Sequence, residues 1–117
     1  MRERDFQRTI IEAAEALGWM VYHNAYAKGN LRSRTSVGFP DLILVHSRYD
    51  LPVLAWEIKV GRNKPTEAQR KWLHRLEACS ISIKVITPDD WEYVKQKLKE
   101  KTHDICNRAI YEGNSGK

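Results

Sequence analysis

The chain has 117 residues, a formal net charge of +5 and an apolar content ordinary for a globular protein. This length allows one domain with one modest core, and no apolar run approaches the roughly 18 residues that span a bilayer, so we expect no membrane partner. The excess of basic charge favours a polyanionic partner, usually nucleic acid, although many basic proteins bind nothing acidic. The charged first residues have no apolar segment behind them, which indicates no signal peptide and favours the cytoplasm.

The first third of the chain predicts a helix, a strand and a long basic loop. Phe6, Ile10 and Leu17 recur at helical spacing over residues 3–17, and the glycine that follows is a natural helix end. Residues 19–23 are rich in strand-forming side chains. The next loop has two open interpretations, because it could be a solvated connection or a DNA contact through its cations, Lys28, Arg32 and Arg34.

Two hydrophobic runs in the middle of the chain predict adjacent strands joined by a turn. Residues 41–45 form a run with little polar interruption, so we expect a strand that is buried on both faces. Residues 53–59 form the second strand, in which alternation places Glu57 and Lys59 on one face, about 6.5–7 Å apart. We therefore expect two charged side chains at the end of a buried strand.

The last part of the chain predicts a helix, a strand and a further helix. A basic loop follows residue 60, with Arg62 and Lys64 as cations that could contact DNA. Thr66 and Gln69 then match a capping box, which predicts the start of a helix that ends near residue 78. Residues 81–86 are typical of a strand, and the threonine, proline and two acids that follow predict another helix start.

The expected order of elements is therefore α-β-β-β-α-β-α. This order fits an α/β fold in which a mixed β-sheet is flanked by helices on both faces. We expect residues 1–117 to form a single domain, with a core over 1–101 and a C-terminal extension over 102–117 that is partly disordered.

Asp41, Glu57 and Lys59 are explained better together than singly. Alone, they would be a turn residue, an exposed edge residue and a solvated strand end. A turn between neighbouring strands, however, brings the start of the first beside the end of the second, so Asp41 should meet Glu57. Two carboxylates repel there unless a divalent cation lies between them, and oxygen ligands favour Mg²⁺ or Mn²⁺. The carbonyl of Ile58 could add a ligand, and Lys59 could orient a water that attacks a phosphodiester.

Two further polar residues have open interpretations. Glu3 shares a helix face with Phe6 and Ile10, so its carboxylate could reach the metal site or could simply favour the positive end of the helix. Gln69 shares its face with apolar residues and could contact the site, but the capping box with Thr66 is an alternative use of the same side chain.

Several short motifs carry a resemblance to a known family. A Pro-Asp is followed after 15 residues by Glu-x-Lys, within Gly38-Phe39-Pro40-Asp41-Leu42 and Trp56-Glu57-Ile58-Lys59. Glu3-x-x-Phe6-Gln7 precedes them, and Lys64-x-Thr66-x-x-Gln69 follows. Together these motifs resemble the VRR-NUC family of the PD-(D/E)xK nuclease superfamily, especially its short stand-alone members from phages and bacteria. One departure is Cys79-Ser80, where the family often has a glycine before a strand.

The resemblance implies a restriction-endonuclease-like core and hydrolysis of DNA phosphodiesters that depends on Mg²⁺ or Mn²⁺. It implies catalytic roles for Asp41, Glu57, Lys59 and Gln69. It implies metal ligation by Glu3, Asp41 and Glu57, to which the position of Ile58 between Glu57 and Lys59 could add its carbonyl. It also implies a homodimer that acts on branched DNA, such as Holliday junctions, in the cytoplasm of a bacterial or phage-infected cell.

Two other functions remain open at the level of sequence. The chain could be a DNA-binding module that keeps a nuclease fold without turnover, or a small interaction protein whose charge serves solubility. Binding alone gains nothing from two acids that face phosphates, and an interaction protein has no need of Glu-x-Lys at the end of a buried strand. We therefore expect a metal-dependent endonuclease.

Overall fold

A computed structural model describes residues 1–24 and 37–101 of the chain. Lys28, Arg32 and Arg34, and the extension 102–117, lie outside the described residues. The helices and strands follow the predicted order, with a short 3₁₀ turn before the last helix. They are α1 (Glu3–Ala16), β1 (Trp19–His23), β2 (Leu42–His46), β3 (Leu54–Ile58), α2 (Glu67–Ala78), β4 (Ser82–Ile86), η2 (Pro88–Asp90) and α3 (Trp91–Leu98).

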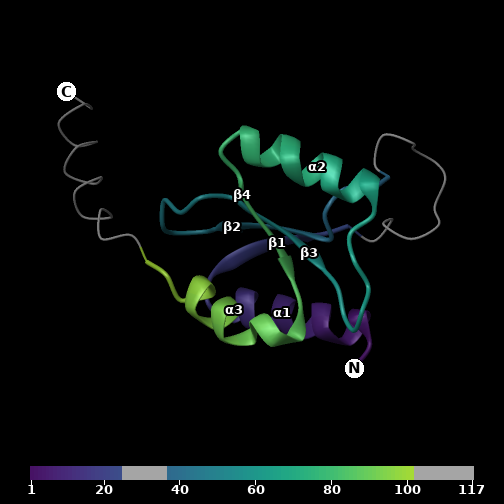
Figure 1. The fold of residues 1–117 in the computed structure, drawn as a ribbon. Coiled ribbons are helices and arrows are strands. Elements are labelled where there is room, and N and C mark those ends of the chain that lie inside the picture. The colour runs from purple at the N-terminus through teal and green to yellow at the C-terminus, as the bar shows by residue number, and fades with distance from the viewer. Residues whose placement is uncertain (25–36, 102–117) are drawn as a thin grey trace.

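The four strands form one mixed sheet in the order β1-β2-β3-β4 (Figure 1). β1 pairs antiparallel with β2, and β2 antiparallel with β3. β3 pairs parallel with β4, because α2 carries the chain back over the sheet between them. The predicted α/β class with a mixed, helix-flanked sheet is confirmed.

The helices cover the two faces of the sheet unequally. α1 and α3 pack side by side on one face, and α2 lies on the other (Figure 1). All five residues of β3 are buried, because this strand is central and has helices over both of its faces. The main core lies between the sheet and the pair α1 and α3, and its residues include Phe6, Ile10, Ala14, Leu42, Leu44, Leu54, Trp56, Ile58, Val94 and Leu98.

The prediction that β2 is buried on both faces is wrong. Leu42 and Leu44 are buried, whereas Ile43 is only half-buried. The reason is that α2 packs on β3 and β4, so that on the same face of the sheet it does not cover β1 and β2. Met20 and Tyr22 lie on that uncovered half and are 60% and 56% exposed.

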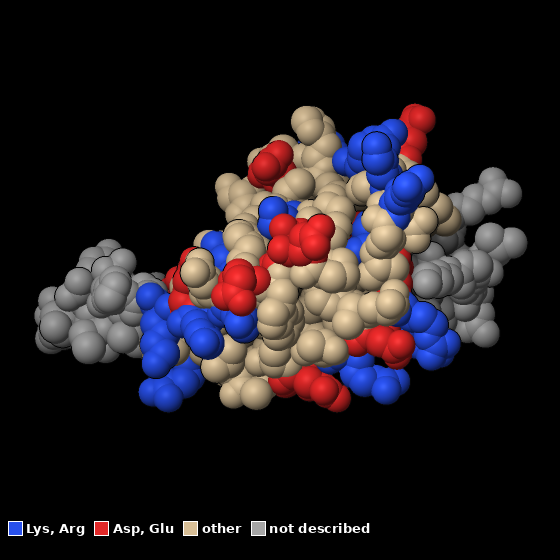
Figure 2. Space-filling view, turned by 60° about the horizontal axis from the view of Figure 1, so that its bottom comes forward, with Lys and Arg blue, Asp and Glu red and all other residues tan. Residues whose placement is uncertain are grey.

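The outer face formed by α1 and α3 carries both signs of charge. Figure 2 shows Lys and Arg side chains gathered toward the ends of this face, with Asp and Glu side chains between them. The net positive charge of the chain is therefore not spread as one continuous basic surface on this side.

No helix in residues 1–24 and 37–101 is long and apolar enough to cross a membrane.

α2 ends in a turn that normally favours glycine. The N–H of Ser80 donates to the carbonyl of Glu77 at 3.0 Å, and that of Ile81 donates to Leu76 at 3.2 Å, which is the Schellman pattern. Ser80 occupies its left-handed position with φ 68°. Cys79, which precedes it with φ −98°, is exposed and unpaired, contrary to the common burial of free thiols.

We expect Ser80→Gly to raise the free energy of unfolding by about 0.5–1 kcal/mol, because glycine adopts positive φ without steric cost. Urea unfolding followed by circular dichroism measures the change. Cys79→Gly is the matched control, because its φ is negative and glycine there only adds freedom to the unfolded chain. A gain in Cys79→Gly equal to that in Ser80→Gly would contradict the explanation.

Candidate functional site

The strand register places Asp41 beside Glu57. Leu42 pairs with Trp56 and Ile43 with Ala55, so the residue that precedes β2 lies opposite Glu57 on the same side of the sheet. Both carboxyl groups are buried, and Glu57 is only 1% exposed. The structure thus brings together the two acids that the sequence analysis expected to meet, although their chemical roles stay predictions.

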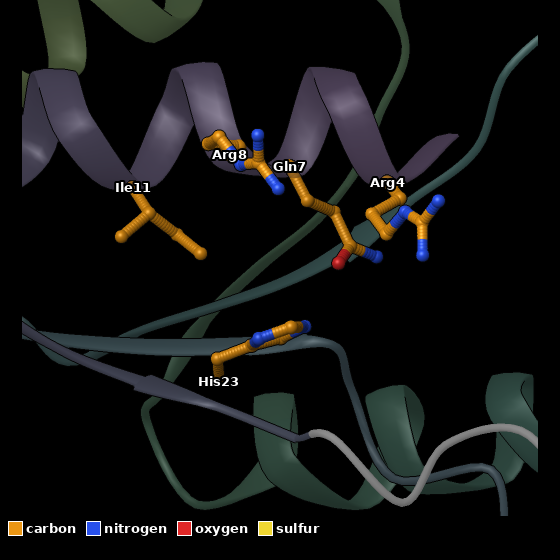
Figure 3. Close-up of a pocket in the computed structure, with 5 residues that line it drawn as sticks. All are labelled: Arg4, Gln7, Arg8, Ile11 and His23. Atoms are coloured by element: carbon orange, nitrogen blue, oxygen red, sulfur yellow. The ribbon is translucent and has the colours of Figure 1, made fainter. Parts of the chain in front are cut away.

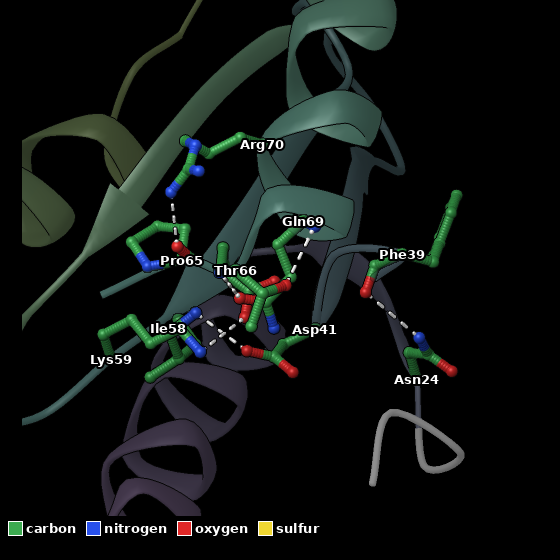
Figure 4. A network of polar contacts seen from close by, with 10 residues as sticks. Asn24, Phe39, Asp41, Ile58, Lys59, Pro65, Thr66, Gln69 and Arg70 are labelled. Atoms are coloured by element: carbon green, nitrogen blue, oxygen red, sulfur yellow. Dashed lines mark hydrogen bonds and ion pairs between the residues drawn. The ribbon is translucent and has the colours of Figure 1, made fainter. Parts of the chain in front are cut away.

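Asp41 is fixed by hydrogen bonds to the strands on both sides of it. Its Oδ2 accepts the backbone N–H of Ile58 on β3 at 2.8 Å (Figure 4). Its carbonyl accepts the backbone N–H of Asn24, next to β1, also at 2.8 Å. The N–H and C=O of one strand residue point toward the same neighbouring strand, so the carbonyl of Ile58 also lies on the Asp41 side of β3.

Lys59 completes the charged group at the end of β3. Its Nζ lies 3.5 Å from Glu57 Oε2, and its side chain is only 12% exposed. Its backbone N–H donates to the carbonyl of Ile86 at 2.9 Å, which extends the pairing of β3 with β4 by one residue. Glu57 and Lys59 therefore share a face, as the alternation of the strand predicts.

The environment of Glu57 disfavours its charged form. Burial, reinforced by the negative charge of Asp41 and only partly offset by Lys59, raises the pKa of Glu57 to about 8. Its Oε1 has no hydrogen-bond partner among the described residues. A buried carboxyl oxygen without a partner is costly, so the site lacks a positive group or a donor at this point.

The capping box at the start of α2 is confirmed, and it uses the side-chain oxygen of Gln69. Gln69 Oε1 accepts the backbone N–H of Thr66 at 2.8 Å, and Gln69 N–H donates to Thr66 Oγ1 at 3.1 Å (Figure 4). The side-chain oxygen of Gln69 is thus committed to the cap, whereas its amide Nε2 takes no part in it. A role for Gln69 in catalysis stays a prediction, and Nε2 is the atom left to fulfil it.

The segment that leads into Asp41 is pressed against α2. Gly38 has φ 85°, and a Cβ there would lie 2.6 Å from the backbone carbon of Ala68. The rings of Phe39 and Trp72 meet edge to face at 5.0 Å, and Trp72 Nε1 donates to the carbonyl of Val37 at 3.1 Å. These contacts fix the approach of the chain to the site.

The remaining predicted site residues are placed less closely. Glu3 is half-buried at the start of α1. The described residues hold no group of three or more His, Cys, Asp or Glu side chains placed to bind a metal ion, and metal ligation by Glu3 stays a prediction. Arg62 and Lys64 are exposed on the loop after β3, where DNA contact stays a prediction.

Asn24 and Gln7 were not singled out for the site from the sequence. Asn24 is buried and donates from Nδ2 to the carbonyl of Phe39 at 3.3 Å, besides its backbone bond to Asp41. Gln7 is buried on α1. In the sequence, Gln7 is a polar residue beside the apolar stripe of a helix, and Asn24 is a polar residue at the end of a strand. Both patterns are too common to indicate a functional site.

Comparisons with models of protein families, with curated proteins and with solved structures find no match to this chain. The likeness to VRR-NUC nucleases therefore depends on the sequence motifs. Any assignment of function has to be argued from the site itself.

We expect Gly38→Ala to lower the free energy of unfolding by about 2–4 kcal/mol, since it combines a strained φ with a backbone clash against α2. Gly61→Ala is the matched control, because Gly61 has φ 63° but nothing within 4 Å of its missing Cβ. Only strain of about 1 kcal/mol should appear there. Urea unfolding of both variants gives the difference, and equal losses would contradict the tight packing of Gly38.

A second expectation concerns pH in the metal-free protein. Between pH 4.5 and about 8 the folded protein keeps a proton on Glu57 that the unfolded chain has released, so this group's contribution to stability falls as the pH rises. Glu57→Gln, which resembles the protonated form, should match wild type near pH 5 and exceed it by about 4 kcal/mol near pH 8.5. Urea unfolding in EDTA tests this, with exposed Glu77→Gln as control. A stability difference that is the same at both pH values would contradict it.

Proposed function

We propose that this protein is a metal-dependent endonuclease that hydrolyses DNA phosphodiesters, with a preference for branched DNA such as Holliday junctions. The observation that carries the proposal is the buried pair Asp41 and Glu57 with Lys59 beside it, at the end of a central strand. The VRR-NUC motifs of the sequence point to the same chemistry and to a restriction-endonuclease-like core.

The donor set at this site fits a hard divalent cation. Asp41, Glu57 and the carbonyl of Ile58 offer only oxygen, which suits Mg²⁺ or Mn²⁺. The partnerless Oε1 of Glu57 and the raised pKa of this carboxyl are both features that a bound cation would relieve. When bound, such a cation would polarise the scissile phosphate and lower the pKa of a coordinated water. Glu3 is retained as a further candidate ligand.

The protein's own groups have distinct roles in this proposal. The hydrogen bond from Ile58 N–H holds Asp41 Oδ2 in place, so that the carboxylate need not reorganise as the reaction proceeds. Lys59 is held beside Glu57 by their ion pair, from where its ammonium can orient the attacking water or offset charge on the phosphate. Gln69 Nε2 can donate a hydrogen bond to the same phosphate.

Exposed cations supply the contacts to the DNA backbone in this proposal. Arg62 and Lys64 follow directly on the strand that carries Glu57 and Lys59, and both are exposed. Lys28, Arg32 and Arg34 of the predicted basic loop are proposed to add further phosphate contacts.

We further propose that two copies of the chain act together. Paired active sites suit paired cuts in a symmetric junction. Met20 and Tyr22 leave an exposed apolar strip on the edge strand β1, a surface that a second copy can cover.

We expect Mg²⁺ or Mn²⁺, but not EDTA, to support cleavage of a supercoiled plasmid and of a synthetic four-way junction. Asp41→Asn, Glu57→Gln and Lys59→Ala should each lower the rate at least about 100-fold, because each removes a group that acts in the transition state. Asp41→Asn and Glu57→Gln should bind DNA as tightly as wild type or more tightly, since neither adds negative charge near phosphate and Asp41→Asn removes one.

Asp89→Asn is the matched control, because Asp89 is exposed on η2 and plays no part in the site. It should cleave at the wild-type rate. Binding without cleavage by wild type would favour the alternative, a non-catalytic DNA-binding module. Equal cleavage by wild type and Asp41→Asn would refute the proposed site.

A further inference from the structure

A hollow lies between α1 and the end of β1, outside the carboxylate site. It has a volume of about 230 Å³ and is lined by Arg4, Gln7, Arg8, Ile11 and His23 (Figure 3). Four of these residues, all except His23, lie along one face of α1, where residues three or four positions apart are neighbours. Gln7 extends from the helix toward the strand end that carries His23 (Figure 3).

The hollow has an excess of positive charge and a nearly buried amide donor. No acidic residue lines it, and neither Arg4 nor Arg8 forms an ion pair with the described residues. On the same helix Arg2, by contrast, is paired with Asp5 at 3.3 Å. Gln7 is only 6% exposed, and its side chain extends into the hollow (Figure 3). An amide held in this position can donate a hydrogen bond to a ligand that occupies the hollow.

The hollow and the carboxylate site lie at the same end of the sheet. His23 of β1 pairs with Leu42 of β2. Asn24, which follows His23, donates its backbone N–H to the carbonyl of Asp41, which precedes Leu42, and this bond connects the two sites. Adjacent strands are about 5 Å apart, so only one strand spacing separates them along the sheet. Because side chains alternate, His23 faces α1, whereas Asp41 and Glu57 point to the opposite face.

We propose that this hollow binds an internal phosphodiester of the DNA strand, close to the one that is cleaved; the inference rests on the DNA substrate proposed above. Guanidinium groups bind phosphate oxygens with paired hydrogen bonds, and the amide of Gln7 provides a further donor. Ile11 offers an apolar wall for the adjoining sugar. No carboxylate in the hollow opposes a phosphate there.

The test is DNA binding in EDTA, measured by fluorescence anisotropy, which needs no catalysis. The double variant Arg4→Gln/Arg8→Gln should bind a 5′-hydroxyl oligonucleotide and a four-way junction at least about tenfold more weakly. The slope of log affinity against log salt should fall by about 1, for one lost phosphate contact. Arg2→Gln/Arg48→Gln is the matched control, since it also removes two charges but leaves the hollow intact, and it should change affinity less than about twofold.

A scan of single methylphosphonate substitutions along the oligonucleotide locates the contact. One internal position should weaken binding to wild type but not to Arg4→Gln/Arg8→Gln. Equal losses in the two double variants, or a dependence on a terminal 5′-phosphate, would overturn the inference, as would absence of DNA binding. If wild type binds DNA with this pattern but does not cleave it, the proposed nuclease activity is refuted and the phosphate site is supported. If wild type cleaves DNA but Arg4→Gln/Arg8→Gln binds as tightly as wild type, the phosphate site is refuted and the nuclease activity is supported.

Discussion

The burial of the Glu57 carboxyl beside Asp41 is the constraint on which the rest of the site depends. β3 is a central strand with helices over both faces and all five of its residues are buried, so a charge on it has little access to water. Such a group must be neutralised by a proton, a cation or a hydrogen-bonding partner. Lys59 supplies part of this compensation to Glu57. The N–H of Ile58 donates its hydrogen bond to Asp41 and not to Glu57. A site that carries this cost and still leaves Oε1 without a partner is better explained by ligand binding than by stability.

The surrounding fold holds Asp41 more firmly than a turn residue requires. The chain reaches it through Gly38, whose contact with α2 leaves no space for a side chain, and through the edge-to-face rings of Phe39 and Trp72. Asn24 then binds this segment from the β1 side. Contacts from α2 and β1 thus fix the backbone that leads into Asp41, and the N–H of Ile58 on β3 fixes its carboxylate. A rigid position of this kind is what electrostatic stabilisation of a transition state demands.

Local patterns in the sequence predicted most of this arrangement, and long-range packing accounts for what they missed. The alternation of β3 was sufficient to place Glu57 and Lys59 on one face, and Thr66 and Gln69 were sufficient to predict the cap of α2. The burial of β2 could not be predicted, because it depends on which strands α2 covers. The role of Asn24 in holding Asp41 was also missed, because the two residues are far apart in sequence and meet only in the paired strands. The local geometry of the site was therefore predictable, whereas the coverage of the sheet was not.

The positions of the two sites constrain the path of any DNA strand. The carboxylates point to the α2 face of the sheet and the basic hollow opens toward α1, yet both lie where β1 ends and β2 begins. A strand that contacts both must pass over this end of the sheet, not along the outer face of α1 and α3. The mixed charges of that outer face agree with this path, since acidic side chains interrupt the basic ones there (Figure 2). Affinity for DNA would then depend on a few placed guanidinium groups and not on the net charge of the chain, because phosphate contacts act locally within a screening length of about 10 Å.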